Sequence, residues 1–183
     1  MTRFAKPAFR LDDVPILFQS IAMSDSSLAK LVPDAGSVCR GIQRLFARND
    51  VWLMPEMPLR NGRRADLMGL DAKGQIVIVE VKVQRGDLLG DGKWPDYLDF
   101  CDRFYWGLPP ELDRAILDQD DYRPDCCGIV VADGYDGEIV RPAPLQPLAA
   151  ARRKVEVERL ARAAMRRATV ASDPHCAPWG NSE

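Results

Sequence analysis

The sequence predicts an α/β domain with a mixed central β-sheet flanked by helices, and three observations favour this class. The run from Gln75 to Val83 is apolar until two late charges, and its β-branched residues indicate a strand that is buried on both faces. The turn sequence Asp71-Ala72-Lys73-Gly74 precedes it and is typical of an antiparallel hairpin. Around the hairpin, the elements follow the order helix, strand, hairpin strand, central strand, helix and strand.

The first assigned element is a helix that begins at Asp34-Ala35-Gly36-Ser37 and continues to Arg48. Residues 1–34 are treated as an N-terminal extension with no assigned structure. One helical stripe, which includes Val38 and Ile42, is expected to pack on the sheet. A second stripe is basic and faces solvent or a phosphate chain; it consists of Arg40, Arg44 and Arg48.

A strand pattern from Val51 to Met57 follows the helix. Pro55 lies within this pattern, and a proline lacks the N–H that a central strand needs for pairing. The sequence therefore predicts an edge position or a bulge for this strand.

The hairpin turn fixes a pairing register. If Ala72–Gly74 form a three-residue loop with glycine in the left-handed conformation, Asp71 faces Gln75 across the ladder. The same register places Asp66 directly opposite Glu80, with β-carbons roughly 5 Å apart on one face of the sheet. Lys82 shares that face, because side chains alternate along a strand.

The remaining elements follow from apolar patterns and turn residues. They are a helix opened by Lys93-Trp94-Pro95, a strand at 103–108, a short helix at 110–117, strands at 126–132 and 138–141, and a long helix at 145–168. We therefore expect one domain over residues 35–170 and a loose tail over residues 171–183.

Two opposed carboxylates repel each other, so a positive charge is expected between Asp66 and Glu80. Lys82 can supply part of that charge, and a hard divalent cation with oxygen ligands can supply more. The simpler interpretation is a strand-edge aspartate beside an ordinary ion pair. Gln84 keeps the parity of Glu80 and can bind a water or a phosphate, or simply cap the next helix.

Composition excludes several classes. With 183 residues, 46% hydrophobic and 28% charged, the chain matches an ordinary globular domain. Five cysteines without C-x-x-C spacing and a single histidine argue against a zinc site and favour a reducing cytoplasm. No apolar run reaches membrane-spanning length, so we expect a cytoplasmic protein that does not bind a membrane.

Charge is segregated although the net charge is only −2. Six arginines against two acids lie between residues 38 and 64, and seven basic residues against two acids lie between 149 and 168. Such flanking segments can attract a phosphate backbone, although arginines on solvated helix faces are common. The candidate nucleic-acid-binding residues are Arg40, Arg44, Arg60, Arg63, Arg64 and Lys93.

The pattern Asp66…Glu80-Val81-Lys82 resembles the PD-(D/E)xK signature of the restriction-endonuclease-like nuclease superfamily. The wider context, with Arg63-Arg64-Ala65-Asp66, Lys93 to Tyr97 and Cys101 to Tyr105, resembles the bacterial MmcB-like DNA repair proteins. This similarity covers about residues 39–168.

The resemblance implies a restriction-endonuclease-like αβββαβ core and metal-dependent cleavage of DNA during repair, with DNA and other repair proteins as partners. It implies that Asp66 and Glu80 ligate Mg²⁺ or Mn²⁺, with the Val81 carbonyl as a further ligand. Lys82 orients the attacking water. Gln84 is added to the candidate catalytic residues because of its strand parity with Glu80 and Lys82. Many superfamily members carry an acid on the first helix; residues 38–47 contain none, and Glu56 is a candidate replacement.

Two other functions stay open. The protein can be a DNA-binding accessory factor whose catalysis is absent or depends on a partner, which the missing helix acid favours. It can also be a metal-dependent phosphoesterase that acts on RNA or on nucleotides.

Overall fold

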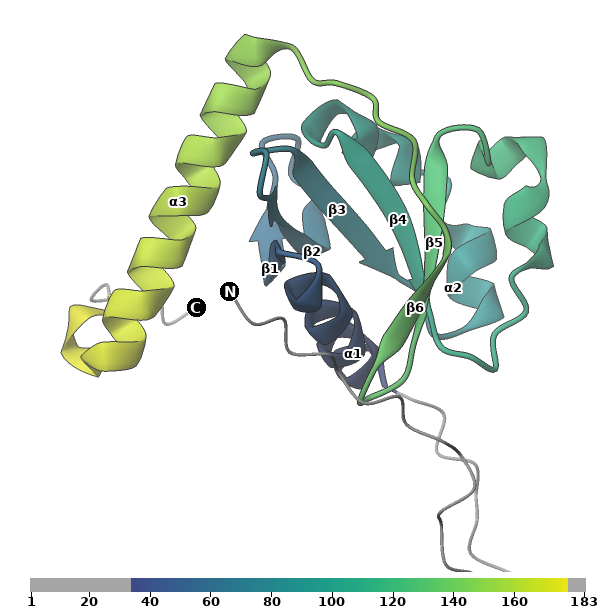
Figure 1. Cartoon of the computed structure of the whole chain (residues 1–183), viewed down its shortest axis with the longest axis horizontal. Coiled ribbons are helices and arrows are strands. Elements are labelled where there is room, and N and C mark those ends of the chain that lie inside the picture. Colours follow the sequence, from purple (N-terminus) through teal and green to yellow (C-terminus); the bar gives the residue numbers. More distant parts are fainter. Residues whose placement is uncertain (1–33, 178–183) are drawn as a thin grey trace, which may run out of the picture. The chain divides into compact units, whose positions relative to one another are not determined.

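The computed structural model describes residues 34–177, which form a six-stranded mixed sheet with helices on both faces (Figure 1). The strands are β1 (Val51–Pro58), β2 (Arg64–Asp71), β3 (Ile76–Val81), β4 (Arg103–Leu108), β5 (Cys127–Ala132) and β6 (Gly137–Arg141). They lie in chain order across the sheet. β3, β4 and β5 are parallel to one another, and the other neighbouring pairs are antiparallel. The predicted mixed central sheet is confirmed.

The hairpin register is also confirmed. Leu67 pairs with Val79 in the β2–β3 ladder, and the Asp71 amide donates to the Gln75 carbonyl over 3.0 Å. Gly74 has a φ of +72°, the left-handed conformation that the loop requires. Asp66 and Glu80 therefore lie at the next level of this ladder.

β1 is an edge strand, as Pro55 predicted. Its register with β2 places Glu56 opposite Asp66, between the pairs Pro55–Leu67 and Met57–Ala65. Glu56 has a φ of +54°, which is unusual for a residue with a side chain, and the ladder pairing is interrupted there.

Helix α1 (Ala35–Arg48) covers one face of the sheet. The Asp34 side chain caps it by accepting a hydrogen bond from the Ser37 amide over 2.6 Å. Val38 and Ile42 are fully buried against the alternate valines of β3, as the sequence predicted.

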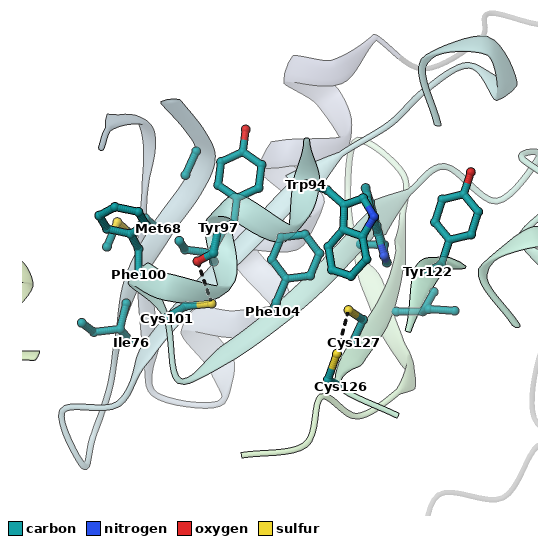
Figure 2. Close-up of a cluster of buried hydrophobic side chains, with 14 of the residues drawn as sticks. Met68, Ile76, Trp94, Tyr97, Phe100, Cys101, Phe104, Tyr122, Cys126 and Cys127 are labelled. Atoms are coloured by element: carbon teal, nitrogen blue, oxygen red, sulfur yellow. Dashed lines mark hydrogen bonds between the residues drawn. The ribbon is translucent and has the colours of Figure 1, made fainter. Parts of the chain in front are cut away.

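The opposite face carries an aromatic cluster that includes Trp94, Tyr97, Phe104 and Trp106 (Figure 2). Four short helices contribute to it: α2 (Arg85–Gly90) and the 3₁₀ helices η1 (Trp94–Phe100), η2 (Ala115–Asp118) and η3 (Asp120–Tyr122). The predictions for this region need correction. A short helix occupies part of the loop expected after Gln84, and the segment opened by Lys93 is a 3₁₀ helix. The expected helix at 110–117 reduces to η2.

Helix α3 (Ala150–Ser172) begins later than the predicted Leu145, because Pro147 disfavours a helical conformation of Gln146 and the Leu148 amide donates to Asp102 instead. Several of its basic side chains are used within the fold. Arg159 donates to the Pro58 carbonyl, and Arg167 donates to the carbonyls of Pro55 and Glu56. The edge of β1 is therefore covered by arginines of α3.

Helix α3 extends past the predicted domain boundary at residue 170. A short 3₁₀ helix, η4 (Pro174–Cys176), follows it. The predicted N-terminal extension, Asp34 apart, and the end of the predicted tail lie outside the described residues. Within residues 34–177, no helix is both long and apolar enough to cross a membrane.

Candidate functional site

Three acidic residues lie at one level of neighbouring strands. β1 contributes Glu56, β2 contributes Asp66 and β3 contributes Glu80. Asp66 is partly buried, and its Oδ2 accepts a hydrogen bond of 2.7 Å from the amide of Val81. Burial raises the pKa of Asp66, while this hydrogen bond and the charge of Lys82 act in the opposite direction.

Glu80 is the most enclosed of these acids, with a side chain that is 8% exposed. Its Oε1 accepts a hydrogen bond from Lys82 Nζ over 3.0 Å, but its Oε2 is buried and has no partner within the described residues. Burial, and then the charge of Asp66, raise the pKa of Glu80 to about 7. An unpartnered buried carboxylate oxygen is costly and calls for a positive group.

Lys82 is shared between two carboxylates. Its Nζ lies 3.0 Å from Glu80 Oε1 and 2.8 Å from Asp91 Oδ2, and both Lys82 and Asp91 are mostly buried. Burial alone lowers the pKa of Lys82, but the hydrogen bond to Asp91 and the charge of Glu80 outweigh it and raise the pKa. Asp91 was not predicted from the sequence, because it follows α2 and belongs to no motif.

Two further side chains border the carboxylates. The Tyr97 hydroxyl donates to the Arg64 carbonyl over 3.2 Å, and Figure 2 shows it pointing away from the aromatic cluster. Burial and then the charge of Glu80 raise the pKa of Tyr97. On α1, burial and then the charges of Asp66, Glu56 and Glu80 raise the pKa of the Cys39 thiol to about 12. Cys39, the α1 residue whose pKa these carboxylates raise, is thus an uncharged thiol.

The local charge balance is negative. Lys82 faces Asp66, Glu80 and Asp91, while Arg64 is used by Glu56 through an ion pair of 2.6 Å. Within residues 34–177, no three acidic, histidine or cysteine side chains are arranged to hold a metal together. Two carboxylates can still hold Mg²⁺ when a phosphate and waters supply the other ligands. The unpartnered Oε2 of Glu80 and the excess negative charge fit such a cation.

Strand alternation does not place the Gln84 side chain on the face of the carboxylates. β3 ends at Val81, so the parity argument stops before Gln84, whose side chain is exposed at the start of α2 without capping it. Val81 contributes its amide to Asp66; a role for its carbonyl stays a prediction.

The predicted nucleic-acid-binding residues divide into two groups. Three are engaged within the fold: Arg44 donates to the Gly134 and Tyr135 carbonyls, Arg63 pairs with Asp96 over 2.9 Å, and Arg64 pairs with Glu56. Three others are exposed, and no ion pair involves them in the described part of the chain: Arg40, Arg60 and Lys93. Phosphate binding by any of them stays a prediction.

The chain is similar to a known protein family and to a solved structure. The model of a family described as DNA repair protein MmcB-like matches residues 22–175. A solved structure of the SPO1766 protein of unknown function from Silicibacter pomeroyi is 39% identical, with a TM-score of 0.70 over 81% of this chain and 97% of that chain. No curated protein matches.

Proposed function

Because the chain belongs to the MmcB-like family of DNA repair proteins, we propose that it hydrolyses DNA phosphodiester bonds with a divalent cation at Asp66 and Glu80. The family suggests a role in DNA repair. Cleavage and its dependence on Mg²⁺ or Mn²⁺ are our proposal. We also propose that the antiparallel strands β1, β2 and β3 and their flanking helices form a restriction-endonuclease-like core.

The observation that carries the proposal is the buried Oε2 of Glu80, which lacks a partner beside a second carboxylate. A structural ion pair with Lys82 leaves this oxygen unsatisfied, whereas a cation with Glu80 and Asp66 as ligands would satisfy it. When bound, the cation supplies a water of lowered pKa and neutralises charge on the phosphate oxygens.

The chain's own residues then orient the reacting groups and stabilise the charge on the phosphate. Lys82 Nζ can donate to the attacking water or to a phosphate oxygen, and Asp91 holds the ammonium at the site through its 2.8 Å contact. Burial of Glu80 and Lys82 strengthens these charge interactions by limiting solvent screening. Arg40, Arg60 and Lys93 are proposed to contact the DNA backbone.

A cleavage assay tests this function. The full chain is incubated with labelled single-stranded, nicked and branched DNA in Mg²⁺, Mn²⁺ or EDTA. We expect cleavage with either metal, and a loss of at least about 100-fold for Asp66→Asn, Glu80→Gln and Lys82→Met, as for removal of charge-stabilising groups in other enzymes. Glu111→Gln, which neutralises an exposed acid elsewhere, should leave cleavage unchanged. Cleavage that survives Asp66→Asn and Glu80→Gln refutes the assignment.

A second candidate is a DNA-binding accessory factor without catalysis. The double ion pair of Lys82 favours it, because a lysine held between Glu80 and Asp91 is itself a counter-charge for the acids. This candidate predicts tight DNA binding and no cleavage with any metal or DNA structure. The same assay therefore decides between the two.

A further inference from the structure

An apolar groove lies between α3 and the strands β1 and β2. Its volume is about 450 Å³, and its apolar lining includes Trp52, Met54, Met68 and Leu70 from the strands and Leu160 and Ala164 from α3. Trp52 pairs with Leu70 in the β1–β2 ladder, and Met54 pairs with Met68, so these four side chains share one face of the sheet. An apolar groove at the surface is typical of a site that binds another protein.

Two exposed apolar side chains border this groove. Trp52 is 67% exposed, and its indole Nε1 donates to Asp50 Oδ1 over 3.1 Å, which restrains the ring. Met165 of α3 is 60% exposed; it follows Ala164 and lies about one helical turn after Ala161, and both alanines line the groove. The same surface therefore has a hollow and a projecting side chain beside it. An interface between two identical copies across a two-fold axis needs such self-complementarity.

The charges of the groove and of α3 are complementary. The charged residues that line the groove are both acidic, Asp50 and Asp71. Arg162 and Arg166 are exposed on either side of Met165 in α3, and no ion pair within residues 34–177 involves them. Since like charges four residues apart on a helix repel each other, an acidic surface that faces these arginines stabilises the helix. The groove of a second copy provides such a surface.

The position of α3 favours a second copy of the chain as the occupant of the groove. α3 both borders the groove and carries Met165, so a two-fold axis beside α3 brings each Met165 to the groove of the other copy. Ala161, Ala164 and Ala168 are exposed, and their small side chains allow two α3 helices to approach closely. A second copy thus supplies the apolar side chain, the small residues and the basic charges that fit the groove.

We propose that this groove is the interface of a two-fold symmetric dimer. Met165 of each copy lies in the groove of the other copy, and Arg162 and Arg166 lie near the acidic residues that line it. Asp66 and Glu80 do not line the groove, so this inference is independent of the proposed cleavage of DNA.

The test is sedimentation velocity of the full chain over a range of concentrations, and we expect a reversible dimer. Met165→Glu should raise the dissociation constant of the dimer at least about 100-fold, because a carboxylate enters an apolar groove twice and each entry costs about 10-fold or more. Met165→Leu conserves volume and should dimerise as the wild type does. Because Met165 is exposed in the single chain, neither substitution should change the circular dichroism spectrum.

The charge complementarity is tested by the double substitution Arg162→Gln with Arg166→Gln. It should weaken the dimer about 10-fold at low salt, because ion pairs at the edge of an interface are individually weak but occur in both halves. The dimer of this variant should also depend less on salt than the wild-type dimer does, because salt screens exposed charges. A salt dependence equal to that of the wild type contradicts the assigned contact of the arginines.

Tyr135→Glu is the matched control, because Tyr135 is 81% exposed but does not line the groove; it should dimerise as the wild type does. A wild type that stays monomeric at every concentration overturns the inference and leaves the groove to a different partner. A dimer that Met165→Glu leaves intact also overturns it, because the two copies then meet through another surface. The cleavage assay judges the proposed function separately in either case.

Discussion

Glu80 has an environment unlike that of an ordinary glutamate at a strand end. Its carboxyl group is enclosed, one oxygen has no partner in the described residues, and its pKa is raised to about 7 by burial and by Asp66. Buried Glu156 of α3 also has one oxygen without a partner among the same residues, so it is the neighbouring carboxylate of Asp66 that sets Glu80 apart.

The raised pKa predicts a pH-dependent stability. The folded state holds the Glu80 proton more tightly than the unfolded chain, so this contribution is fully present below about pH 4.5 and is lost as pH rises through about 7. In EDTA, the stability of Glu80→Gln relative to the wild type should rise by about 2–3 kcal/mol between pH 5 and pH 8. Urea unfolding at a series of pH values measures this. A flat difference, equal to that of Glu111→Gln, contradicts the assigned environment.

The sequence predicted which site residues lie together only where local backbone geometry determines their positions. Asp66, Glu80 and Lys82 could be placed together because one turn fixes the hairpin register. Asp91 and Cys39 could not, because they reach the site through tertiary packing of α2 and α1, which no local pattern reveals.

At the scale of elements, the strands were predicted well and the short helices poorly. Strands 103–108 and 138–141 carry apolar runs bounded by turn residues, and the structure matches them to within one residue. The segment 94–100 was read as an ordinary helix because its apolar residues recur at helical spacing. It forms a 3₁₀ helix instead, since Trp94, Tyr97 and Phe100 recur every third residue and all three rings belong to the cluster.

Asp102 links β3, the segment before α3 and α3 itself, and we expect its loss to destabilise the fold. Its buried carboxylate accepts hydrogen bonds of 2.8 Å from the amides of Ile76 and Leu148, and it pairs with Arg153 of α3. Asp102→Ala should destabilise the fold by about 3–5 kcal/mol, because these donors lose their partner. Urea unfolding checks the loss.

Asp99→Ala, at an exposed acid nearby, should change stability by no more than about 0.5 kcal/mol. An Asp102→Ala variant as stable as Asp99→Ala would show that α3 is not anchored through this residue.

At the scale of the whole molecule, the mixed sheet serves to bring acids from neighbouring strands to one level. The two faces of β3 are covered by α1 and by the aromatic cluster, and the polar site opens where β3 ends. The net charge of −2 hides this arrangement, because basic and acidic residues are concentrated in different segments of the sequence. The sequence could predict the fold class and the acids, but not the cleft between α1 and β1, which requires these two elements to be docked.

The most direct measurement is a calorimetric titration of Mn²⁺ into the metal-free full chain, alongside Asp66→Asn, Glu80→Gln and the control Glu111→Gln. We expect a Mn²⁺ site in the wild type and in Glu111→Gln that each of the other two variants loses, with protons released on binding near pH 7 because Glu80 must ionise. Absence of Mn²⁺ binding by the wild type, or binding that survives both substitutions, would contradict the cation site and leave Lys82 as the counter-charge of the acids.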